Sequence, residues 1–187
     1  SRVNIDLEEG AEVKLVMLLE PSENGLVRHE VRAECGVNSH IHIMTIMIGR
    51  GDIYSDDHVT LSGDGARFDA DAAYLGKNSQ TIDYNIVADH FGKKTESLIT
   101  VNGALTDSAK KVFRGTIDFK KGSADSVGSE NETVLMLGDD VVNKTVPLIL
   151  CAEENVEGTH GATIGELDAD TMFYFESRGI DRETAEK

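Results

Sequence analysis

The stretch that decides the fold is Arg67-Phe68-Asp69-Ala70-Asp71-Ala72-Ala73-Tyr74. From Phe68 to Tyr74, apolar residues occupy every second position, and charged residues fill most of the positions between them. Strict alternation places the apolar side chains on one face of an extended chain, which is typical of a half-buried β-strand. Residues 82–88 repeat the pattern, and the sequence therefore predicts a fold built mainly from strands.

Short strands of this kind recur along the chain at similar intervals. Their apolar residues Phe68, Ile82, Leu98 and Val112 are separated by 14, 16 and 14 residues. Strands at nearly regular intervals are typical of a β-sandwich, a β-barrel or a β-helix. The interval is too loose for periodicity alone to choose among these folds.

Other segments differ in how completely their strands are expected to be covered. Residues 13–20 and 41–48 are apolar at consecutive positions, which favours strands that are buried on both faces. Residues 134–137 and 146–151 are the last apolar segments of this kind. The stretch from residue 120 to residue 132 is rich in Gly, Ser, Asp and Glu, and it is predicted to be an exposed connection.

The composition of the chain limits the kinds of protein that it can be. With 187 residues, 40% of them hydrophobic, it is long and apolar enough for one domain with a sizeable core. A formal net charge of −16 argues against nucleic acid and anionic membranes as main partners, because both require basic surfaces. No apolar run approaches the ~20 residues of a membrane span, and no signal peptide is visible. Two distant cysteines, Cys35 and Cys151, favour a reducing cytoplasm.

The C-terminal end carries the clearest helix signal. We predict a β domain over residues 1–167 and the start of a helical region over residues 168–187. Asp168 or Asp170 can cap the helix, and Gly179 can end it in the left-handed conformation. The apolar face of this helix is supplied by Met172, Phe173 and Phe175.

His160 is predicted to lie in a turn of small residues, Thr159-His160-Gly161-Ala162, which follows an acidic turn. Small neighbours would leave its ring accessible, and a neutral imidazole can bind a borderline metal or an iron at the edge of a cluster. The alternative is a histidine in a turn that bonds only to a backbone carbonyl. His160 is the first candidate for a cluster or metal ligand.

The two cysteines are weaker candidates. Cys151 ends an apolar strand ahead of Glu153 and Glu154, and thiolates are the preferred ligands of iron–sulfur clusters. Nearby carboxylates disfavour the thiolate form, and most free cysteines are small buried apolar residues. We favour that interpretation for Cys151, and more strongly for Cys35, which lacks a Cys-x-x-Cys partner.

His40 and His42 project from one face of a strand, at a spacing that metal-binding barrels of the cupin type use. Such barrels usually add a carboxylate a few residues later, and residues 45–47 offer none. Solvated histidines are the more ordinary interpretation. His40 and His42 are therefore secondary metal candidates.

Six aspartates crowd residues 52–71. On a parallel β-helix such acids can bind calcium or act as paired general acid and base on a polysaccharide. A solvated acidic face is the simpler explanation. The sequence has no Walker loop and no Gly-x-Ser-x-Gly motif, which leaves nucleotide hydrolysis and serine-hydrolase chemistry without support.

The second half of the chain holds several motifs in a specific order. They are Phe113-Arg114-Gly115-Thr116-Ile117, Leu135 to Asp140, Pro147, His160-Gly161-Ala162-Thr163, and Phe173-Tyr174 with Ser177-Arg178-Gly179-Ile180. Together they resemble the SufB/SufD family of iron–sulfur cluster assembly proteins, in usable detail over residues 60–187. The resemblance implies an all-β fold, a right-handed parallel β-helix with a short C-terminal helical stub.

The resemblance implies a role as well as a fold. The chain would be a SufD-like, non-catalytic subunit that works with a SufC-type ABC ATPase and pairs with a SufB-type subunit or with itself. Its cargo would be iron or a transient iron–sulfur cluster, with His160 at the SufD-type histidine and Cys151 as the second candidate. The SufB-type cysteine position falls near Glu132, which makes the chain SufD-like.

Two contact regions are implied by the same resemblance. Dimerisation through the C-terminal ends of the β-helices would involve Glu132, Leu135, Pro147, Thr159 and Gly161. Docking of the ATPase would involve Phe173, Tyr174, Arg178 and Gly179. Two other functions stay open: an acidic β-helix enzyme or binding module for polysaccharide, and an interaction protein that dimerises without touching metal.

Overall fold

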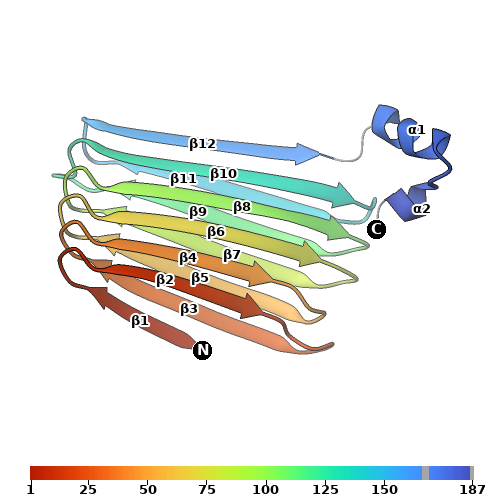
Figure 1. The fold of residues 1–187 in the computed structure, drawn as a ribbon, viewed down its shortest axis with the longest axis horizontal. Coiled ribbons are helices and arrows are strands. Elements are labelled where there is room, and N and C mark those ends of the chain that lie inside the picture. Colours follow the sequence, from red (N-terminus) through yellow and green to blue (C-terminus); the bar gives the residue numbers. More distant parts are fainter. Residues whose placement is uncertain (166–168, 186–187) are drawn as a thin grey trace.

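A computed structural model, which describes residues 1–165 and 169–185, shows a parallel β-helix made of two facing sheets (Figure 1). The first sheet contains, in spatial order, β1 (Arg2–Leu7), β3 (Leu26–Cys35), β5 (Asp52–Leu61), β7 (Thr81–His90), β9 (Lys110–Phe119) and β11 (Val142–Cys151). The second contains β2 (Glu12–Leu19), β4 (His40–Met47), β6 (Arg67–Gly76), β8 (Glu96–Thr106), β10 (Ser126–Leu137) and β12 (Val156–Gly165). The predicted β-helix is confirmed.

Each turn of the β-helix contributes one strand to each sheet. Strands that follow each other along the chain therefore lie in different sheets, whereas strands two apart are hydrogen-bonded neighbours. The length of a turn is visible at Asp52, whose carboxylate accepts the backbone N–H of Thr81, 29 residues later. The predicted intervals of 14 to 16 residues correspond to half-turns.

The inward-facing residues of both sheets fill the space between them. Phe68 and Ile82 are fully buried, and the apolar positions of residues 68–74 and 82–88 point inward as predicted. Leu98 differs, because it is 41% exposed on the outer face of β8. Its neighbour Ser97 takes the inward position that pairs with Phe68.

Two strands that were predicted to be buried on both faces are only partly covered. Val16 and Leu18 of β2 are 61% and 57% exposed, and Ile46 of β4 is 39% exposed. Each sheet of a β-helix has an inner face and an outer face, so an apolar residue at an outward position is covered only where another element packs over it. The prediction was wrong for these outward positions.

The predicted exposed connection over residues 120–132 is also wrong for most of its length. Ser126 begins β10, a strand of 12 residues. Glu130 and Glu132 of this strand are buried, each with 2% of its surface exposed. Polar composition suggested a loop, whereas pairing with β8 and β12 holds the segment in a sheet.

Two short helices follow β12 and lie to one side of the β-helix, beside the carboxyl ends of the strands of the second sheet (Figure 1). They are α1 (Ala169–Ser177) and α2 (Arg182–Ala185). Met172 of α1 is buried, in agreement with the predicted apolar face. Phe173 is 71% exposed, so its predicted place on that face is wrong. The proposed cap Asp168 lies outside the described residues. Neither helix in the described part of the chain is long and apolar enough to cross a membrane.

Candidate functional site

The predicted cluster-ligand and interface residues lie on the last three strands of the β-helix, β10 to β12. β11 and β12 are the last strands of their sheets, and in the described chain each is paired along one edge only. Edge strands of this kind present N–H and C=O groups that another chain can bind. This end therefore offers backbone groups as well as side chains to a further component.

His160 lies in the middle of β12, so its predicted position in a turn is wrong. The register of β12 with β10 sets His160 beside Glu130. Because Glu130 is buried inside the β-helix, His160 occupies the same inward-facing position one turn later. β12 is the last strand of the described chain, and His160 is exposed. The structure thus places an accessible imidazole over the interior of the fold.

Four polar residues near this end of the β-helix form a group that we call the polar floor: Lys111, Glu130 and Glu132, which are buried, and Thr145 of β11, which is half-buried. The side chains of Lys111 and Glu132 are 1% and 0% exposed, and they form an ion pair. Lys111 Nζ also donates to the hydroxyl of Thr145 at 3.2 Å, and that hydroxyl donates to Glu132. Burial of an ion pair is tolerated only where further hydrogen bonds satisfy both groups, as Thr145 does here.

Glu130 is the member of the polar floor whose carboxylate has no ion pair among the described residues. Its buried Oε2 atom has no hydrogen-bond partner among the described residues. The carboxylate lies against the backbone of Gly115, where a Cβ atom would come within 2.1 Å of that oxygen. Burial, together with the neighbouring Glu132, raises the pKa of Glu130 to about 7, and Lys111 limits the rise.

Sequence reasoning missed Lys111 and Glu130 as site residues. A signal was present, because Gly128, Glu130 and Glu132 share the alternating positions that lead to the buried Val134. Extending the strand backward from Val134 would have placed both glutamates on the inward face. Lys111 gives the same kind of signal, because it shares the alternating inward positions of Phe113, Ile117 and Phe119 in β9. Only its pairing with Glu132, which lies 21 residues away, has no local signal.

Cys151 occupies the last position of β11 and is exposed, so the prediction of a buried apolar residue is wrong. In register it follows Phe119, an inward-facing residue. The β12 residue that faces β11 is Gly158, where a Cβ atom would lie 2.9 Å from Ile149. The chain reverses direction between the two strands (Figure 1), so His160 and Cys151 lie on opposite sides of this contact. The structure does not bring them together.

The predicted interface residues differ in their exposure. Thr159 and Gly161 of β12 are exposed, and Leu135 of β10 is half-buried. Pro147 is half-buried in β11, where an edge strand tolerates the missing N–H of proline. Glu132 is buried and lies under this end rather than on its surface.

The predicted ATPase-docking residues lie in and just after α1. Phe173 and Tyr174 are exposed, with 71% and 55% of their surfaces accessible. The guanidinium carbon of Arg178 lies 5.2 Å from the centre of the Tyr174 ring, a cation–π contact. Gly179 follows with a φ of +81°, the left-handed conformation expected at the end of a helix.

His40 and His42 share the outer face of β4, as predicted, but they do not converge on one point. His40 Nε2 lies 2.8 Å from Asp69 Oδ2, and His42 Nε2 lies 2.7 Å from Asp71 Oδ2. Each histidine thus forms its own pair with the next strand of the sheet. The described residues contain no group of three or more His, Cys, Asp or Glu that could hold a metal ion.

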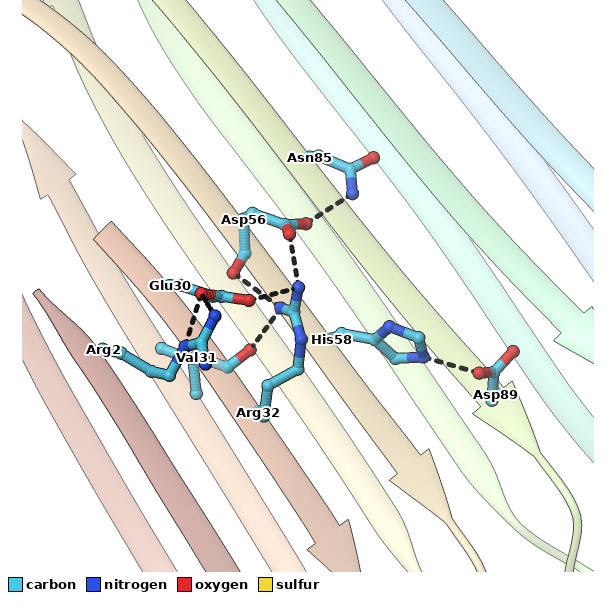
Figure 2. A network of polar contacts seen from close by, with 8 residues as sticks. All are labelled: Arg2, Glu30, Val31, Arg32, Asp56, His58, Asn85 and Asp89. Carbon is cyan, nitrogen blue, oxygen red and sulfur yellow. Dashed lines mark hydrogen bonds and ion pairs between the residues drawn. The ribbon is translucent and has the colours of Figure 1, made fainter. Parts of the chain in front are cut away.

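A polar network covers the outer face of the first sheet (Figure 2). It contains Arg2, Glu30, Arg32, Asp56, Asn85, His58 and Asp89. Arg32 bridges two strands by bonding to both Glu30 and Asp56, and Asn85 extends the contact to a third strand. His58 and Asp89 form a separate pair, with 2.6 Å between their nearest atoms. The network links neighbouring turns, and its members Glu30, Asp56 and Asn85 also line a pocket on this face.

The acid-rich segment does not form one site. Asp52 and Asp64 accept backbone N–H groups of the following turn. Asp56, Asp69 and Asp71 bond to the side chains already named, on two different sheets. In the described chain these acids therefore give the polysaccharide hypothesis no paired general acid and base.

Asp57 and Cys35 are ionisable groups that are buried in earlier turns. Asp57 is fully buried and accepts a hydrogen bond of 2.7 Å from the hydroxyl of Tyr84. Burial raises the pKa of Asp57 to about 7, although the Tyr84 bond opposes the rise. Cys35 is buried as predicted, and burial raises the pKa of its thiol to about 11.

Comparisons with known proteins give a family and relatives that are named for iron–sulfur cluster assembly. The family described as "SUF system FeS cluster assembly, SufBD core domain" matches residues 1–187. The iron–sulfur cluster assembly protein SufD of Bacillus subtilis is 31% identical over 152 residues, which are 81% of this chain and 35% of that protein. The chloroplastic SufBD family protein ABCI8 of Arabidopsis thaliana is 25% identical over 150 residues, covering 80% of this chain and 27% of that protein. The chain thus spans roughly a third of the length of these relatives.

Proposed function

Because the chain belongs to the SufB/SufD family, whose core domain matches it from end to end, we propose that it is a SufD-like subunit for iron–sulfur cluster assembly. In this proposal it is a non-catalytic scaffold that works with a SufC-type ABC ATPase. It pairs with a SufB-type subunit or with a second copy of itself. The observation that carries the proposal is the accessible His160 above the polar floor, at the end of the β-helix.

The cargo at this end is iron or a nascent cluster, and His160 is its first ligand. An iron–sulfur cluster takes about four protein ligands, and the described residues bring no such set together. Cys151, the second candidate, lies on the far side of the contact between Gly158 and Ile149. The remaining ligands would come from the partner, which suits a cluster held briefly between two subunits.

The partner binds across the last turn of the β-helix. The edges of β11 and β12 that are unpaired within the described chain offer backbone groups for strand pairing. Leu135, Pro147, Thr159 and Gly161 contribute the surface of the interface. Glu132 supports this surface from beneath, because it is buried against Lys111.

The ATPase docks on α1 and the residues after it. Phe173 and Tyr174 offer exposed aromatic surface, and Arg178 stacks on Tyr174. Exposed aromatic residues of this kind are enriched in protein interfaces. We place the complex in the cytoplasm, where the two free cysteines stay reduced.

Anaerobic reconstitution tests this proposal. The complex with its ATPase and partner subunit is supplied with iron and sulfide, and cluster formation is followed by ultraviolet–visible absorption. We expect His160→Ala to lower cluster build-up several-fold while the fold survives, because His160 is exposed. His42→Ala removes an imidazole paired with Asp71 elsewhere and serves as the control. Normal cluster formation by His160→Ala would show that the role given to His160 is wrong.

A further inference from the structure

Glu130 and His160 are stacked in neighbouring strands at the C-terminal end of the β-helix. They are partners in the register of β10 and β12, and adjacent strands lie about 4.8 Å apart. Both occupy inward-facing positions, so their side chains project in the same direction. An exposed imidazole therefore lies directly over a buried carboxylate.

One oxygen of the Glu130 carboxylate, Oε2, is buried without a hydrogen-bond partner among the described residues. Only 2% of Glu130 is exposed. Gly115 leaves room for this arrangement, because a Cβ atom there would lie 2.1 Å from Oε2. A buried carboxylate oxygen without a partner is costly unless a positive charge joins it.

The charges around Glu130 favour a cation. Lys111 is the cation of the polar floor, and it is already committed to Glu132 and Thr145. With both glutamates ionised, the polar floor carries one negative charge more than it carries positive charge. A divalent cation that enters from the open end would meet His160 first and Glu130 directly beneath it.

We propose that Glu130 and His160 together form a ferrous-ion site at the end of the β-helix, with the imidazole and the carboxylate as its two ligands from this chain. This inference rests on the proposed function, in which iron is cargo. Imidazole and carboxylate are both ligands that ferrous iron accepts. Two protein ligands hold the ion loosely, and water, sulfide or the partner subunit completes the coordination. A loosely held ion suits delivery to a growing cluster.

Anaerobic calorimetric titration of the whole chain with Fe²⁺ tests the pair. The variants are Glu130→Gln, which keeps the size of the side chain, and His160→Ala. The matched control is Glu157→Gln, which removes the same charge from an exposed residue of β12. We expect each site variant to bind Fe²⁺ at least about tenfold more weakly than the parent chain, while the control stays within about twofold.

Thermal melting of each variant checks that the fold is intact. If Glu130→Gln melts early, Glu130→Asp replaces it, because this variant keeps the charge but withdraws the carboxylate by one methylene. We expect Glu130→Asp to weaken Fe²⁺ binding by a similar factor.

The outcomes separate this inference from the proposed function. Loss of binding with His160→Ala but not with the Glu130 variants overturns the pair and leaves His160 as a ligand. Absence of Fe²⁺ binding to the parent chain overturns the site, while cluster build-up on the complex still decides the assembly role. If Fe²⁺ binding requires both residues but the complex builds no cluster, the site stands and the proposed function fails.

Discussion

In the second sheet, register partners on successive strands form columns of inward-facing side chains. One such column changes from apolar to ionisable residues along the β-helix. From β2 to β8 the column holds Leu15, Ile43, Ala70 and Ile99. From β10 to β12 the same column holds Glu130 and His160. The backbone places all six in equivalent positions, so the difference lies in the side chains that the sequence supplies. In this column, the middle turns carry apolar side chains and the last turns carry ionisable ones.

The two regions also differ in how they are covered. A residue in the middle has a turn of the β-helix on both sides, whereas a residue of β12 is covered on one side only in the described chain. Ile99 is fully buried, while Ile164 of β12 is 48% exposed. Stability is therefore expected to depend on the middle, and binding on the end.

The sharpest test of this contrast removes one apolar side chain from each region. Phe68→Ala opens a cavity in the middle of the core and is expected to cost roughly 3–5 kcal/mol of unfolding free energy. Ile164→Ala takes an apolar side chain from the end and is expected to cost less than about 1 kcal/mol. Urea unfolding followed by circular dichroism measures both. Equal losses would show that the last turn is as well packed as the middle.

The buried ion pair gives the next largest effect. Lys111→Met leaves Glu132 charged and buried without its cation, which is expected to cost about 3 kcal/mol. The double variant Lys111→Met with Glu132→Leu removes both charges and is expected to regain most of that loss. The same urea titration compares the two. If the double variant is no more stable than the single one, the penalty comes from lost packing rather than from an unpaired charge.

The dependence of stability on pH reports on Asp57 and Glu130, two buried acids whose pKa values are raised. Burial raises the pKa of Asp57 from its ordinary 3.8 to about 7, so the folded chain binds more protons than the unfolded chain between these values. Stability therefore falls as pH rises from about 4 to about 7. Glu130, whose pKa is raised to about 7 from 4.5, acts in the same direction.

Asp57→Asn removes one of these titrations from the middle of the fold. The unfolding free energy of the variant is expected to fall less steeply with rising pH, by at most about 1.4 kcal/mol per pH unit. Unfolding at pH 5.5, 6.25 and 7 measures the slope, with Asp64→Asn as a control at an exposed turn. An unchanged slope would mean that Asp57 ionises as freely as it does in the unfolded chain.

Local alternation predicted the strands well, because side chains of a strand alternate whatever the strand pairs with. The strands over residues 68–74 and 82–88 were predicted from neighbouring residues alone. The alternate apolar positions of both segments point inward as expected. The resemblance of short motifs then selected the β-helix from the three folds that alternation left open. The order of these motifs along the chain was enough to choose the β-helix.

Pairing between turns could not be read from the sequence. The register of β10 with β12 joins residues that are far apart in the chain, and no local pattern fixes it. For this reason His160 was expected in a turn and Glu130 in a loop, although the structure sets them side by side. The polarity of Glu130 argued for solvent, whereas its position in the ladder turns it inward.

The smallest expected effect comes from the outer polar network, which contrasts with the ion pair of the polar floor. Arg2 bonds to Glu30 at 2.6 Å, but 63% of the Arg2 side chain is exposed. Water and salt screen such a pair, so Arg2→Ala is expected to cost less than about 1 kcal/mol. Urea unfolding at low and high salt measures the loss. A cost close to that of Lys111→Met would mean that the surface ladders, rather than the packed middle turns, hold the β-helix together.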